Sequence, residues 1–136
     1  MNQQHTPERD RESFLTSVLT AGFSAPTQKW ADVQDFALYI PRFGEKDEIK
    51  PGPHGGHNAR MRMRDRATGT DYTVGITDVA RALELIRHTP APALNMAERT
   101  RAAVLSWDEY AVRQDIDPQV ADQVIQVAAL GRVAHP

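Results

Sequence analysis

The clearest pattern of hydrophobic and polar positions lies in residues 59–66, which read Ala-Arg-Met-Arg-Met-Arg-Asp-Arg. Side chains of a β-strand point alternately to the two faces of a sheet. This period of two therefore predicts a strand whose methionines lie on a core. The arginines between them, Arg60, Arg62 and Arg64, then form a row on the opposite, solvent-exposed face.

A second strand follows directly and completes a β-hairpin. Residues 66–71 supply turn chemistry, and Gly69 can adopt the positive φ that such a turn needs. Apolar residues then alternate with small or polar ones over residues 72–77. Residues 30–40, which are rich in aromatic and branched side chains, predict a further strand, and Pro41 either ends it or confines its end to an edge of the sheet.

Apolar residues at helical spacing predict four helices, over residues 7–22, 78–88, 96–113 and 118–131. A restart of the third helix at Ser106 is an alternative. Thr77 and Asn95 are the expected N-caps of the second and third helices, and Asn95 forms a capping-box pattern with Glu98. Gly22 is the expected end of the first helix. The order α-β-β-β-α-α-α predicts an α+β fold, with a small three-stranded antiparallel sheet covered by helices.

Length and composition fit one domain spanning residues 1–136. Within it we expect a flexible N-terminus over residues 1–6, a long loop over residues 42–58 and a C-terminal tail over residues 132–136. The chain has no cysteine, which excludes thiol nucleophiles, disulfides and Cys-based zinc sites. Its apolar runs are too short for a membrane span or a signal sequence. We therefore expect a soluble protein of the cytoplasm that has no membrane partner.

The arginine row is the main candidate binding surface, and we take Arg60, Arg62, Arg64 and Arg66 as candidate binding residues. Guanidinium groups bind oxyanions in a fixed fork. Three arginines at alternate positions span roughly 13 Å, enough to follow two or three phosphates. The alternative is a solvated face whose charge is partly neutralised by nearby carboxylates, namely Asp65, Asp71 or Glu84. The net charge of −2 argues against nucleic-acid binding by bulk charge.

His54 and His57, separated by two glycines in the long loop, are candidate contact residues. Two imidazoles can begin a metal site, but a stable site needs three or four ligands. A solvated loop is the competing interpretation, so we predict no metal and no cofactor. A metal-dependent hydrolase built on this His-Gly-Gly-His loop ranks third among the functional hypotheses.

No catalytic arrangement emerges, and we predict that the protein is not an enzyme. The sequence has no phosphate-binding loop, no dinucleotide fingerprint and no spacing that supports a Ser-His-Asp triad. Asp108 and Glu109 are adjacent on the predicted third helix, so their side chains diverge and cannot form an acid/base pair. Trp30, Trp107 and Tyr110 are interpreted as core or core-edge residues.

Scattered patches over most of the chain resemble a group of small uncharacterised proteins from phages, prophages and bacterial mobile elements. The opening matches in residues 15–23, which read Leu-Thr-Ser-Val-Leu-Thr-Ala-Gly-Phe, and in the Trp-Ala pair at residues 30–31. The end is similar to that group in residues 115–131, and residues 65–69 and 77–83 fit its hairpin-then-helix plan. The chain lacks the glycine pair that precedes Trp-Ala in the group, as well as its Tyr-Gly finish.

The resemblance implies an accessory protein of a phage or mobile element, working in the host bacterial cytosol. It implies no activity, because the group has none assigned. Our leading hypothesis is a non-enzymatic protein that binds a host or phage protein complex, for instance as an inhibitor of host defence. The alternative is a nucleic-acid-binding module that uses the arginine-lined strand. The α-β-β-β-α order over residues 7–88 is also that of double-stranded-RNA-binding domains, but those place a basic cluster where this chain has Asp78 and Val79.

Overall fold

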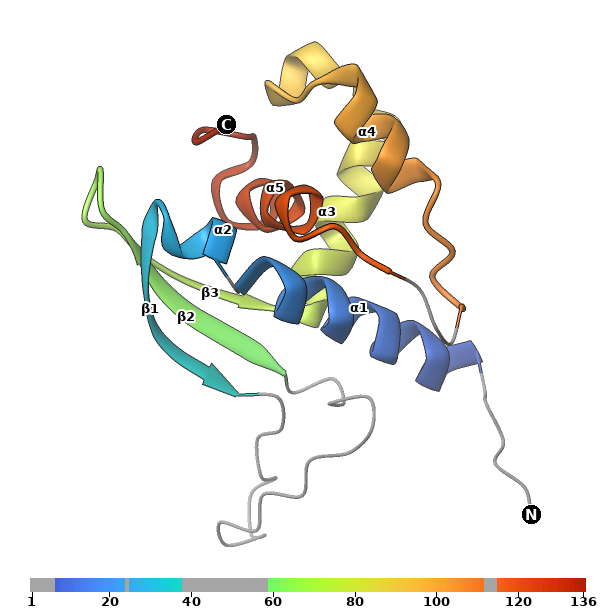
Figure 1. Ribbon diagram of the computed structural model, residues 1–136, viewed down its shortest axis with the longest axis horizontal. Helices are drawn as coiled ribbons and strands as arrows, with labels where there is room; N and C mark the ends of the chain where they lie inside the picture. The colour runs from blue at the N-terminus through green and yellow to red at the C-terminus, as the bar shows by residue number, and fades with distance from the viewer. Residues whose placement is uncertain (1–6, 24, 38–58, 112–114) are drawn as a thin grey trace, which may run out of the picture.

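The computed structural model describes residues 7–23, 25–37, 59–111 and 115–136, and its fold is α+β as predicted. Three strands form an antiparallel sheet in the order β1-β2-β3. Figure 1 shows the described helices on one side of this curved sheet, with α4 farthest from it. The elements are α1 (Pro7–Phe23), α2 (Ala25–Gln28), β1 (Ala31–Ala37), β2 (Arg60–Asp65), β3 (Asp71–Gly75), α3 (Ile76–His88), the 3-10 turn η1 (Ala91–Leu94), α4 (Glu98–Leu105) and α5 (Pro118–Leu130).

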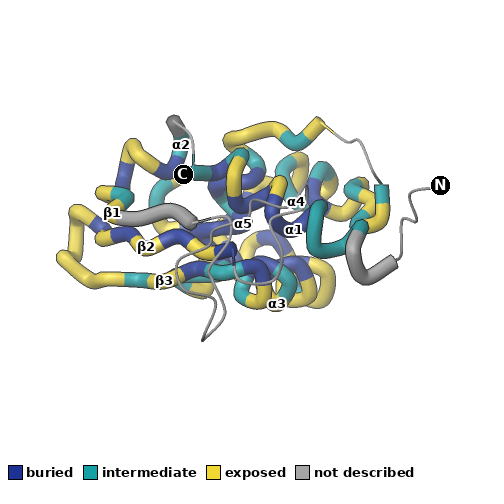
Figure 2. Tube along the Cα trace, turned by 90° about the horizontal axis from the view of Figure 1, so that it is seen from below, coloured by how far each residue is buried: buried dark blue, intermediate teal, exposed yellow. Residues whose placement is uncertain are grey.

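The predicted hairpin is confirmed. Met61 lies opposite Val74 and Arg64 opposite Asp71 in the β2–β3 register. Gly69 in the connecting turn has a φ of +74°, the left-handed conformation that favours glycine. Exposed and buried residues alternate along all six positions of β2, a pattern that Figure 2 shows as alternating colours. The alternation thus separates a methionine face, which joins the core, from an arginine face.

The core lies between the sheet and helices α1, α3 and α5. The α1–α5 contact is close at Gly22, where an added Cβ would lie 2.2 Å from Ile125 Cδ1 and 3.3 Å from the Ala121 carbonyl. Gly22 is therefore buried inside α1, which continues to Phe23. The prediction that Gly22 ends the helix was wrong, because the glycine serves close helix packing rather than a left-handed cap.

Two predicted N-caps were also wrong. Helix α3 begins at Ile76, one residue before Thr77, and its N-cap is Gly75, whose amide donates to the Asp78 carboxylate at 2.8 Å. Asn95 adopts a left-handed φ of 57° at the end of η1, and α4 begins after it at Glu98. In the first case the Asp78 carboxylate, at the third helical position, reaches back to the Gly75 amide, so the helix starts earlier than a cap at Thr77 would allow.

Helix α4 ends at Leu105, well before the predicted Arg113. Residues 106–111 lie outside the helices, so Glu109 does not follow Asp108 on a helix. The carboxylate of Glu109 bonds Arg11 at 2.7 Å and Arg87 at 3.1 Å, and it thereby joins α1 to α3. Tyr110 is 51% exposed, so its interpretation as a core or core-edge residue was wrong.

The remaining helix and strand boundaries agree with the predictions in part. Residues 25–28, for which the sequence patterns predict no helix or strand, form the short helix α2. Helix α5 begins after Asp117 and ends at Gly131 (φ +84°), as predicted. Asp117 caps α5 by accepting from the Gln119 amide at 2.8 Å. Strand β1 starts at Ala31, just after Trp30. Among the described residues, no helix is long and apolar enough to cross a membrane.

Candidate functional site

The arginine face of β2 is the first candidate surface. Arg60, Arg62 and Arg64 are all exposed, on the face opposite the buried methionines, as the alternation predicted. In the β1–β2 register Arg64 lies opposite Asp32, and Arg62 lies opposite Asp35. Acidic positions on β1 therefore run alongside the arginine row.

Carboxylates partly neutralise this face. Arg64 donates to both oxygens of Asp71, at 2.7 and 3.2 Å. This hydrogen bond is the largest influence on the Asp71 carboxyl and lowers its pKa. Asp71 was one of three carboxylates expected to act in this way. Of the other two, Glu84 pairs instead with Arg87 and His88, and Asp65 is buried on the opposite side of the strand.

Arg66 differs from the other three arginines because its guanidinium holds backbone in place. It donates to Asp32 at 2.8 Å and to the carbonyl oxygens of Gln28 and Lys29 at 2.7 and 2.9 Å. These carbonyls lie at and just after the end of α2, where a short helix leaves acceptors unsatisfied. Arg66 thus ties the hairpin to the segment that leads into β1.

The histidine loop lies outside the described residues, together with His54, His57 and the whole of residues 42–58. In the part of the chain that the structure describes, no group of three or more His, Cys, Asp or Glu side chains is placed to hold a metal ion.

A second candidate site is a polar network around Asp122 of α5. The sequence patterns did not predict this network. Asp122 is only 6% exposed. Its Oδ1 accepts from the Thr27 hydroxyl at 2.7 Å and from the Trp30 indole Nε1 at 2.9 Å. Its Oδ2 accepts from Gln126 Nε2 at 2.9 Å. One buried carboxylate therefore joins α5 to α2 and to the start of β1.

Gln126 extends the network to the segment after α5. This side chain is fully buried, and its Nε2 also donates to the carbonyl of His135 at 2.9 Å. Its Oε1 accepts from the backbone amides of Ala134 and His135 at 3.0 and 2.7 Å. A single amide side chain thus fixes the backbone of residues 134–135, which form no helix or strand.

The imidazole of His135 lies between Trp30 and Asp65. It stacks on the Trp30 indole, with ring centroids 4.8 Å apart and planes inclined by 11°. Its Nε2 lies 3.1 Å from Oδ2 of Asp65, a carboxylate that is 3% exposed. Burial is the largest influence on Asp65 and acts to raise its pKa, but hydrogen bonds from His135 and the Ala67 amide outweigh it, so the pKa is lowered.

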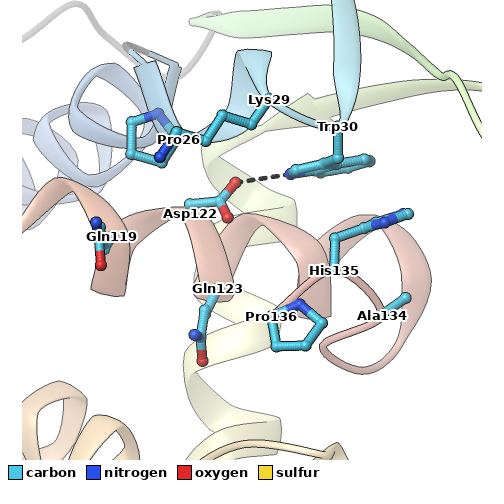
Figure 3. Close-up of a pocket in the computed structure, with 9 residues that line it drawn as sticks. All are labelled: Pro26, Lys29, Trp30, Gln119, Asp122, Gln123, Ala134, His135 and Pro136. Atoms are coloured by element: carbon cyan, nitrogen blue, oxygen red, sulfur yellow. Dashed lines mark hydrogen bonds between the residues drawn. The ribbon is translucent and has the colours of Figure 1, made fainter.

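A pocket of about 500 Å³ lies beside this network, between α2, α5 and the last residues of the chain. Figure 3 shows Trp30 and His135 one above the other beside it, with Asp122 bonded to the indole. The lining residues are Pro26, Lys29, Trp30, Gln119, Asp122, Gln123, Ala134, His135 and Pro136.

The sequence contained one signal for this network. Asp122 and Gln126 are four residues apart, so they share a face of α5 with the apolar side chains that enter the core. Two polar residues on an otherwise buried helical face require partners. Their partners lie more than 90 residues away in sequence or come from a segment without regular structure, so spacing could not identify them.

Comparisons with family models, with curated proteins and with solved structures find no match for this chain.

Proposed function

We propose that this protein is a non-enzymatic binding protein that contacts a protein partner through the arginine face of its sheet. The observation that carries the proposal is an exposed arginine row flanked by carboxylates, with Arg64 bonded to Asp71 on β3. A surface with charges of both signs, held on a rigid sheet, suits the mixed charge of a protein surface.

Nucleic-acid binding is the second candidate, and the exposed row itself favours it. Phosphate binding needs guanidinium groups that are available to release counterions. Arg64 and Arg66 already bond carboxylates within the chain, at 2.7 and 2.8 Å. The chain carries a net charge of −2, which adds repulsion from a polyanion. These observations favour the protein partner.

The sequence resemblance supports a more specific form of the proposal. It favours an accessory protein of a phage or mobile element, acting in the bacterial cytosol on a host or phage protein complex. Inhibition of a host defence complex is the example we favour, because blocking such a complex requires binding and no chemistry.

The test is capture of partners from a bacterial lysate by three tagged proteins. These are the wild type, the face variant Arg60→Glu/Arg62→Glu, and the charge-matched control Arg99→Glu/Arg132→Glu. Both control positions are exposed and lie outside the three strands, in α4 and after α5. We expect a near-stoichiometric protein partner on the wild type and the control, and at least a tenfold loss on the face variant.

Two results would contradict the proposal. Equal capture by all three proteins would place the contact elsewhere on the molecule. Capture of only nuclease-sensitive material by the wild type would favour the nucleic-acid alternative. In that case each phosphate contact removed from the arginine row should reduce the salt slope of binding by about one unit.

A further inference from the structure

The stack of Trp30 and His135 is flanked by a buried carboxylate on each side. Asp122 accepts from the indole at 2.9 Å, and Asp65 lies 3.1 Å from the imidazole. Within the described part of the chain, no arginine or lysine forms an ion pair with either carboxylate. A buried carboxylate favours a cation or a strong donor beside it. The position of the His135 ring therefore suits a flat ring with an N–H donor or a positive charge.

The segment that brings His135 to this position forms no helix or strand, so its backbone is held by bonds from other segments rather than by its own. Val133 is fully buried, and its amide donates to the Leu94 carbonyl at 2.8 Å. Beyond it, Ala134 and Pro136 are exposed and the His135 side chain is 25% exposed. The hydrogen bonds that hold residues 134–135 come from one side chain, Gln126, and from Asp65. Such a segment belongs to the least stable part of a fold.

We propose that Ala134, His135 and Pro136 form a displaceable latch that pivots on Val133, and that its imidazole fills a recognition slot for planar cations between Trp30 and Asp65. The planar cation of a partner protein that would compete for this slot is an arginine or histidine side chain. Opening the latch would remove three of the residues that line the pocket and would uncover one face of Trp30.

The slot has two recognition elements that act in different directions. The Trp30 indole face favours a flat ring or a guanidinium stacked on it. The Asp65 carboxylate accepts from a donor at the edge of that ring. A flexible alkylammonium group satisfies the second element but stacks poorly on the first. The site should therefore prefer imidazole or methylguanidine to butylamine.

The slot is tested by chemical rescue in a protein with one tryptophan. The chain has two tryptophans, and Trp107→Phe leaves Trp30 as the reporter. His135→Ala in this background should change the emission of Trp30. Added imidazole should then restore it saturably, at concentrations on the order of 10 mM, as suits so small a ligand. Butylamine at the same concentration should have no effect.

Asp65→Asn combined with His135→Ala is the matched control, because asparagine keeps an oxygen for the Ala67 amide while losing the charge. We expect imidazole to leave the Trp30 emission of this double variant unchanged. Methylguanidine, like imidazole, should restore the Trp30 emission of the single variant His135→Ala. The recognition slot would be excluded if imidazole did not saturably restore the Trp30 emission of His135→Ala. It would also be excluded if imidazole restored the emission of the double variant equally well.

The latch is tested by amide hydrogen exchange in the wild-type protein, so the test does not depend on whether a variant folds. The amides of Ala134 and His135 are bonded to Gln126, whereas that of Val133 is bonded to Leu94 beside the core. Opening around Val133 predicts exchange of the first two at least about tenfold faster than that of Val133, after correction for intrinsic rates. Equal protection of all three amides would overturn the latch.

Discussion

Replacement of Asp122 by alanine should be strongly destabilising. The change removes the acceptor of three buried hydrogen bonds, from Thr27, Trp30 and Gln126. Thr27 and Gln126 are fully buried and Trp30 is 6% exposed, so their donors depend on this carboxylate. Loss of the acceptor therefore leaves buried donors without partners, which is the expensive way to break a hydrogen bond.

The magnitude follows from the number of donors and from their access to water. A buried group left unsatisfied costs about 1–3 kcal/mol. The adjacent pocket lets water reach part of the network, so the three losses do not add fully. We expect Asp122→Ala to lower the free energy of unfolding by about 3–5 kcal/mol. Asp122→Asn should cost less, about 1–3 kcal/mol, because it keeps Oδ1 but sets an amide donor against Gln126 Nε2.

The assay is urea-induced unfolding at neutral pH, followed by circular dichroism, with free energies compared at a common m-value. Asp115→Ala is the control, since Asp115 is exposed and a surface change of this kind lies within about 0.5 kcal/mol. A loss of less than about 1 kcal/mol for Asp122→Ala would refute the reasoning, because it would show that water replaces the carboxylate without penalty.

Three further predictions concern other parts of the fold. Gly22→Ala should destabilise by about 1 kcal/mol, since crowding against Ile125 and the α5 backbone exceeds the gain in helix propensity; a higher melting temperature would contradict this. The pKa of Asp65 is lowered in the folded state, so its stabilisation is complete above the unfolded-state value of about 4 and is lost as pH falls through the folded-state pKa. The free energy of unfolding measured in urea should therefore fall more steeply between pH 6 and pH 3 for the wild type than for Asp65→Asn. Parallel pH profiles of the two proteins would exclude this contribution. Arg101→Ala should lower the unfolding free energy by about 1–2 kcal/mol, because its guanidinium bonds the last carbonyls of α3; an unchanged urea midpoint would contradict that role.

Local patterns in the sequence predicted much of the fold. The alternation in residues 59–66 identified β2, its two faces and the exposed arginines, because strand geometry alone sets which side chains share a face. Asp117 and Gly131 marked the ends of α5, because capping depends on residues that are adjacent in sequence.

Features that depend on distant residues were not predicted. Gly22 was interpreted as a helix end, but its role is set by Ile125, a residue of another helix. Asp65 was one of three carboxylates expected to neutralise part of the arginine face, but it lies on the buried face of β2 and bonds His135, 70 residues away in sequence. The network around Asp122 likewise became visible only when four separate segments were brought together.

The proposed binding of a protein partner by the arginine face can be tested through the arginine side-chain N–H resonances. The Nε–Hε signals of Arg60, Arg62, Arg64 and Arg66 are assigned by single Arg→Lys variants and measured with and without the captured partner. We expect the signals of Arg60 and Arg62 to shift or broaden in the complex, while the signal of Arg99 on α4 stays unchanged. Unchanged Nε–Hε signals of Arg60 and Arg62 in a saturated complex would contradict binding through the arginine face.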